Sequence, residues 1–100
     1  MSNFSLMRDA DTNRFHLKGE LSFKTVNTII NEAKSLFLSA TELDIDLAGV
    51  TRSDSAGLAL LVEWMRIASA TSRPISFRNV PDQMMAIAGT SGLDKLLPIK

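Results

Sequence analysis

The sequence contains no cysteine. Disulfides, thiolate metal sites and cysteine nucleophiles are therefore excluded, and the core alone must stabilise the fold, which suits a reducing compartment such as the cytosol. An excess of charge of either sign is also missing, because 11 basic residues balance 11 acidic ones. This neutral balance argues against a strongly basic nucleic-acid surface and against a polybasic membrane patch.

Long hydrophobic runs are missing as well. The longest, residues 56–62, is far shorter than the ~20 residues that cross a bilayer. Residues 1–11 hold no continuous apolar stretch of the ~7–15 residues that a signal peptide needs. We therefore expect no direct membrane insertion, and any association with a membrane should come through a partner. Catalysis is poorly supported, since His16 is the single histidine, and a phosphate loop ending in Gly-Lys-Ser/Thr is absent.

The residues that are present predict one α/β domain spanning residues 1–100. Of these, 45% are hydrophobic and 22% are charged, which is a globular composition. Alternating apolar residues predict strands near 4–6, 14–18, 43–47 and 75–78, and spacings of three and four predict helices over 24–38, 55–70 and 82–88. The order is β-β-α-β-α-β-α, with residues 48–54 expected to form a loop. We expect a hairpin, then parallel strands, with the helices on one face of a mixed sheet.

The segment before the second predicted helix carries the clearest signal. Asp54 or Ser55 can accept hydrogen bonds from the free amides of the first helical turn. Ala56 and Gly57 are small, so another group can approach the helix closely. One interpretation is a cap with tight packing. The other is that Ser55 is a regulated or partner-contacting hydroxyl, where a phosphate would leave the fold intact but repel an acidic or apolar partner.

The helix predicted over residues 55–70 is apolar over roughly twice the ~100° stripe that one face of a sheet buries. One stripe is expected to face the core, namely Leu58, Leu61, Val62, Met65 and Ala68. The apolar surface continues around one side through Leu60, Trp64 and Ile67. Either neighbouring helices bury this excess, or it is a protein interface with Trp64 as its anchor. We favour the interface.

Two short motifs resemble the signature of the STAS domain, the fold of sulfate transporters and anti-sigma-factor antagonists. They are DLAGV at residues 46–50 and DSAGL at residues 54–58. The likeness extends over nearly the whole chain, through GEL at 19–21 and SGL at 91–93. The resemblance implies a STAS-like mixed β-sheet with its helices packed on one face.

The resemblance is greatest to the small cytoplasmic STAS subunit of the Mla phospholipid ABC transporter, which maintains outer-membrane lipid asymmetry. It implies a noncatalytic subunit of a hetero-oligomer, without cofactor or metal. Such a subunit binds the transporter's ATPase and, through it, the permease complex at the inner membrane. It implies that the loop at Asp54, Ser55, Ala56 and Gly57 faces the ATPase together with the helix that follows. In that helix, we expect the apolar area for the contact to come from Leu60, Trp64 and Ile67.

The family also implies an alternative function. Anti-sigma-factor antagonists carry a serine at the position of Ser55, and its phosphorylation by a partner kinase breaks their complex. The transporter subunits often carry threonine there. Ser55 therefore keeps the hydroxyl of the subunits but has the residue type of the antagonists, and it is a candidate phosphorylation site.

Overall fold

One mixed sheet in the order β1-β2-β3-β4 organises the computed structural model, which describes residues 3–100. The strands β1 (Phe4–Arg8) and β2 (Phe15–Leu21) form an antiparallel hairpin. The strand β3 (Leu43–Ser53) runs parallel to β2, and β4 (Ile75–Arg78) runs parallel to β3. The predicted element order, hairpin and parallel pairing of the last two strands are confirmed.

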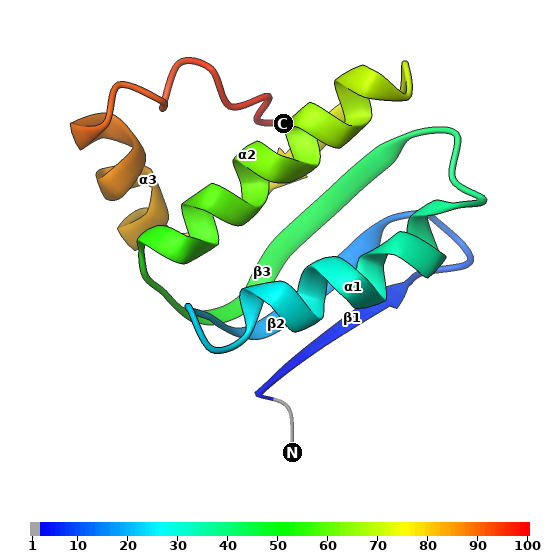
Figure 1. The fold of residues 1–100 in the computed structure, drawn as a ribbon, viewed down its shortest axis with the longest axis horizontal. Coiled ribbons are helices and arrows are strands. Elements are labelled where there is room, and N and C mark those ends of the chain that lie inside the picture. Colours follow the sequence, from blue (N-terminus) through cyan, green and yellow to red (C-terminus); the bar gives the residue numbers. More distant parts are fainter. Residues whose placement is uncertain (1–2) are drawn as a thin grey trace.

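The helices lie on one face of this sheet (Figure 1). They are α1 (Val26–Phe37), α2 (Ser55–Ala70) and α3 (Asp82–Thr90). Figure 1 shows α1 and α2 side by side over the strands, with α3 beside the first turns of α2. This arrangement follows from alternation along the strands, because Phe15, Leu17 and Ile45 are fully buried while their sequence neighbours point to the other face.

Three aromatic rings join α1, α2 and the sheet within the core. The ring of Phe37 meets that of Phe15 edge-to-face at a centroid distance of 4.7 Å, and it meets Trp64 in the same manner at 5.4 Å. Edge-to-face aromatic pairs add ≈ 0.5–1.5 kcal/mol to what area burial contributes. These buried aromatic contacts therefore fix the position of α1 against α2 and the sheet.

The strands β2 and β3 are longer than the sequence predicts. Residues 48–54 were expected to be a loop, but β3 continues to Ser53, where Arg52 and Ser53 pair with Glu20 and Leu21 of β2. This pairing supplies backbone hydrogen bonds that do not depend on an alternating pattern. The register shifts next to Gly19, whose φ of +99° favours glycine.

Charged residues occupy the face of the sheet opposite the helices. Arg78 Nε donates to Asp44 Oδ1 at 2.9 Å. His16 lies between two carboxylates, with Nδ1 3.7 Å from Asp46 Oδ2 and Nε2 3.8 Å from Asp9 Oδ2. The aspartates that alternate along β3 are therefore engaged in ion pairs and hydrogen bonds of the fold.

This network predicts a loss of stability in acid. Desolvation raises the pKa of Asp46, but hydrogen bonds from Asn79 and the Ala48 amide, with the charge of His16, outweigh it and leave the pKa below the ordinary 3.8. A carboxyl with a lower pKa in the folded state stabilises the protein above its unfolded-state pKa, and this contribution is lost as the pH falls through the folded-state value. The free energy of unfolding should therefore decrease below about pH 4.

Urea denaturation between about pH 3 and pH 7 tests this expectation. Asp46→Asn should be less stable than the unmodified protein at neutral pH, and the difference should shrink in acid. Glu42→Gln, at an exposed position before β3, is the control and should change stability little. A constant difference between Asp46→Asn and the unmodified protein across this range would contradict the expectation.

Candidate functional site

The carboxyl ends of β2 and β3 form one edge of the sheet, and α1 and α2 both begin there. The amide of Asp54 donates to the Leu21 carbonyl at 3.1 Å, which ties the two strand ends together. Thr25 directly precedes α1, but its hydroxyl does not cap the helix. It donates to the Glu20 carbonyl at 2.9 Å and accepts from the Ser22 amide at 3.0 Å. Both loops are thus fixed against the same sheet edge.

Asp54 is the residue that caps α2. Its Oδ1 accepts a hydrogen bond from the Ala56 amide at 2.8 Å, and its carbonyl accepts from the Gly57 amide at 3.0 Å. The sequence left Asp54 and Ser55 open as caps, and the structure assigns the role to Asp54. The Ser55 side chain is exposed at the first residue of the helix. Its hydroxyl is therefore available to another molecule without loss of the cap.

Ala56 and Gly57 are buried beneath Ser55. A Cβ atom built at Gly57 would overlap Ser53 Oγ and lie 3.0 Å from Leu21 Cβ. The small size of these residues allows β2 and the end of β3 to approach the helix. The structure therefore supports the interpretation of these small residues as tight packing within the chain.

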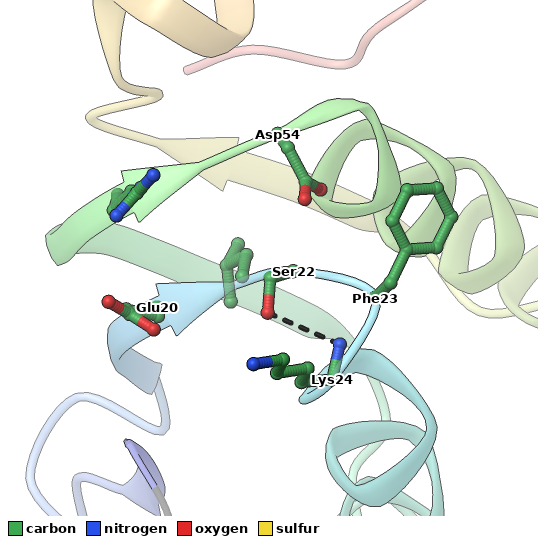
Figure 2. Close-up of a pocket in the computed structure, with 7 residues that line it drawn as sticks. Glu20, Ser22, Phe23, Lys24 and Asp54 are labelled. Atoms are coloured by element: carbon green, nitrogen blue, oxygen red, sulfur yellow. Dashed lines mark hydrogen bonds between the residues drawn. The ribbon is translucent and has the colours of Figure 1, made fainter.

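A cavity of about 330 Å³ opens beside this loop (Figure 2). Its lining comes from both strand ends and consists of Glu20, Leu21, Ser22, Phe23, Lys24, Arg52 and Asp54. Figure 2 shows the ring of Phe23 beside the start of α2, with the Lys24 amide donating to Ser22 Oγ at 3.3 Å. Two acidic and two basic residues line this cavity, so its lining has no excess of charge of either sign.

The prediction that Leu60, Trp64 and Ile67 form an exposed apolar interface on α2 is wrong for two of the three residues. Leu60 and Trp64 are each only 1% exposed, while Ile67 is half-buried. The reason is that α1 packs along this side of α2, with Phe37 against Trp64. Trp64 is therefore a core residue and cannot anchor a partner through exposed area. The alternative that neighbouring helices cover the excess apolar surface is correct here.

A different part of α2 faces solvent beside Ser55. Val62 was predicted to face the core, yet it is 41% exposed, and Ala59 is exposed as well. These residues border a hollow of about 360 Å³ between α2 and α3, whose lining is Ser55, Leu58, Ala59, Val62, Glu63, Ile87, Ser91 and Leu93. We call Ser55, Ala59 and Val62 the Ser55 surface. It combines a free hydroxyl with apolar area.

An ion pair borders the Ser55 surface. Arg66 donates to both carboxylate oxygens of Glu63, at 2.6 and 3.0 Å. The hydrogen bond from Arg66 lowers the pKa of Glu63. Because the pair is exposed, it contributes little to stability. Its effect is to keep these charges associated with each other at the border of the apolar surface.

The structure separates Ser55 from the single histidine. His16 pairs with Asp46, and β3 continues for seven further residues to Ser53, which is roughly 23 Å of strand. The side chain of His16 also lies on the sheet face away from the helices. These two residues cannot act together on one substrate. In the described residues, 3–100, side chains of His, Cys, Asp and Glu form no group of three suited to a metal ion.

Two exposed residues of the helical layer were not predicted as site residues. Phe23 is 76% exposed just before α1, and Leu38 is 84% exposed just after it. Neither residue belongs to the series of apolar residues, three and four apart, that forms the buried face of α1. The pattern therefore did not predict whether either side chain would be buried or exposed. A large apolar residue directly outside a periodic segment is the signal that could have identified them.

Comparison with known proteins matches this chain to a protein family. The chain matches the family described as "Mlab, STAS domain" over residues 4–98. It is 30% identical, over 98 residues, to the intermembrane phospholipid transport system binding protein MlaB of Haemophilus influenzae. That alignment covers 93% of this chain and 92% of the relative.

Solved structures share the fold at lower identity. The unphosphorylated anti-sigma factor antagonist SpoIIAA superposes with a TM-score of 0.71 at 20% identity, covering 97% of this chain and 87% of that one. A point variant of Moorella thermoacetica RsbS superposes with a TM-score of 0.71 at 16% identity, and the alignment covers 99% of this chain and 86% of that one. An anti-sigma factor antagonist from Mycobacterium paratuberculosis superposes with a TM-score of 0.69 at 19% identity, and the alignment covers 96% of this chain and 82% of that one. The chain belongs to the STAS-domain family, as a member of the group described as Mlab.

Proposed function

We propose that this protein is a noncatalytic subunit of a phospholipid ABC transporter, and that it binds the transporter's ATPase. The observation that carries the proposal is the match to MlaB, a binding protein of an intermembrane phospholipid transport system, over nearly the full length of both chains. The STAS fold with its exposed Ser55 supports it. No helix within residues 3–100 has the length and apolarity to cross a membrane, so the ATPase and permease would hold the protein at the inner membrane.

The Ser55 surface is the part of the molecule that we assign to the ATPase. Ser55 offers an exposed hydroxyl, Ala59 an exposed methyl group and Val62 an exposed apolar side chain. Asp54 takes part by holding the first turn of α2, and Ala56 and Gly57 by keeping it close to β2. Leu60 and Trp64 support the helix from beneath. The mechanism would be preferential binding to one conformation or assembly state of the ATPase.

Co-purification tests this assignment. We expect Ser55→Asp to reduce the ATPase recovered with the tagged protein by about tenfold or more, because a charge would be buried in the contact. The fold should be unaffected, since Asp54 and not Ser55 caps the helix. The matched control is Ser69→Asp, the same change at an exposed position near the other end of α2. Equal recovery with both variants would contradict the assignment.

The alternative function is that of an anti-sigma-factor antagonist controlled at Ser55. The exposed hydroxyl favours it, because a kinase needs this access. The antagonist structures, at 16–20% identity, support the fold and not this activity. An anti-sigma kinase that transfers phosphate from ATP to Ser55, together with failure to bind the ATPase, would favour the antagonist. Binding to the ATPase without such transfer would favour the transporter subunit.

A further inference from the structure

A groove runs between α1 and α2, and Ala59 and Glu63 of α2 separate it from the hollow beside α3. Its first hollow, of about 310 Å³, is lined by Phe23, Val26, Asn27, Ile30, Ala56, Ala59, Leu60 and Glu63. Its second, of about 300 Å³, is lined by Ile30, Ala33, Lys34, Phe37, Leu38, Trp64, Ile67 and Arg73. Ile30 lines both, so the two hollows adjoin along the seam between the helices, which lie side by side in Figure 1.

The ends of this groove carry the most exposed large apolar side chains of the described residues. Phe23 is 76% exposed and lines the first hollow, and Leu38 is 84% exposed and lines the second. Phe23 and Leu38 are 15 positions apart in the chain, which is roughly 22 Å at the helical rise of 1.5 Å per residue. Single exposed apolar residues are common on protein surfaces. Two at opposite ends of one apolar groove form a continuous surface the length of a four-turn helix.

The charge of the groove is positive at the Leu38 end. Lys34 and Arg73 line the second hollow, and no carboxylate lines it. Among residues 3–100, neither cation lies within ion-pair distance of a carboxylate. Arg73 donates instead to the carbonyls of Phe37 and Ala40, which holds its guanidinium at the rim. In the first hollow, Glu63 is already paired with Arg66.

We propose that the groove between α1 and α2 binds an amphipathic helix of a partner protein, with apolar residues at i, i+3/i+4 and i+7 toward the groove and acidic residues over Lys34 and Arg73. A groove between two helices, with apolar anchors along its length, fits helix-in-groove recognition. A second copy of the chain brings no unpaired carboxylate on this groove to meet Lys34 and Arg73, because the one carboxylate that lines it, Glu63, is already paired with Arg66. The inference goes beyond the proposed function, because Ser55 and Val62 line the hollow beside α3 and neither hollow of the groove, and the two surfaces share only Ala59.

The single tryptophan provides the measurement. Trp64 lines the second hollow and is the one tryptophan of the chain, so a bound helix should change its fluorescence. The probes are two synthetic helical peptides of about 14 residues, with leucines at the groove-facing positions and either glutamates or lysines at the flanks. We expect saturable binding of the glutamate peptide, and binding of the lysine peptide about tenfold weaker. Equal binding of both peptides, or no saturation by about 1 mM, would overturn the proposal.

Surface variants locate the peptide in the groove. Leu38→Glu should reduce binding of the glutamate peptide by about tenfold or more, and Lys34→Glu should reverse the preference toward the lysine peptide. Leu96→Glu is the matched control, because Leu96 is 64% exposed and lines neither hollow. Unchanged binding in Leu38→Glu would place the peptide elsewhere and overturn the proposal.

A lipid is the other occupant that an apolar groove with cations at one end could accept. Dodecyl phosphate below its micelle concentration is the probe for this outcome. If it changes Trp64 fluorescence saturably and the glutamate peptide does not, the groove is a lipid site and the helix proposal is wrong. Neither result depends on recovery of the ATPase, so failure here is distinguishable from failure of the proposed function.

Discussion

Replacement of Trp64 by alanine is expected to destabilise the protein by about 3–5 kcal/mol, the usual cost of removing a fully buried large aromatic residue. Trp64 is 1% exposed, and its ring packs edge-to-face on Phe37, which in turn packs on Phe15. The substitution therefore leaves a cavity where α1, α2 and the sheet meet. Since domains of this size have about 5–15 kcal/mol of stability, the loss is a large share of the total.

Urea denaturation measures this effect, and Val62→Ala on the same helix is its control. Val62 is 41% exposed, so its truncation should cost less than about 1 kcal/mol. Trp64→Phe keeps an aromatic ring against Phe37 and should lie between the two. If Trp64→Ala were as stable as Val62→Ala, the side chain would have to be at the surface, and the interface that the sequence favoured would be restored.

The result also affects how binding data are interpreted. A loss of ATPase recovery in Trp64→Ala would follow from unfolding, whatever surface the partner uses. Ser55→Asp changes an exposed residue, so it reports on contact itself. For that reason the proposed function is tested at Ser55, and Trp64 is reserved for the question of packing.

Local patterns predicted the elements of the fold correctly where one face of the element is buried. The alternation around Phe15 and Leu17, and the period of three and four along α1, each reflect burial against a single neighbour. The second half of β3 does not alternate, because its pairing with the end of β2 is made by backbone atoms. An alternating pattern does not report such a pairing, and the sequence therefore predicted a loop over residues 48–54, of which 48–53 belong to β3.

The orientation of α2 was the part of the site that the sequence could not predict. Its residues are apolar around most of the helix, so the pattern establishes that several neighbours cover it but not on which sides they lie. Placement of α1 buries Leu60 and Trp64, and the hollow next to α3 leaves Val62 exposed. The start of the helix was predicted better, because caps and small residues act locally. Asp54 caps α2 as one of the two residues proposed.

Gly57→Ala is the second substitution with a large expected effect. The new Cβ would overlap Ser53 Oγ and lie 3.0 Å from Leu21 Cβ. Alanine favours a helix over glycine by roughly 0.5–1 kcal/mol, whereas overpacking costs about 1–3 kcal/mol. We therefore expect a net loss of about 1–2 kcal/mol in the free energy of unfolding. Gly89→Ala is the matched control, because it is also helical and has nothing within 4 Å of a built Cβ.

Gly89→Ala should gain the helix preference without the overlap, so the two glycine variants should differ by about 1–3 kcal/mol, which measures the overlap alone. A double-mutant cycle then identifies the atom responsible. In a Ser53→Ala background the Oγ atom is gone, and Gly57→Ala should cost less than it does with Ser53 present. If the cost were the same in both backgrounds, Leu21 would be the limiting contact. If Gly57→Ala were as stable as Gly89→Ala, the close approach of β2 and β3 to the start of α2 would not constrain this loop, and the fixed position of Ser55 would need another cause.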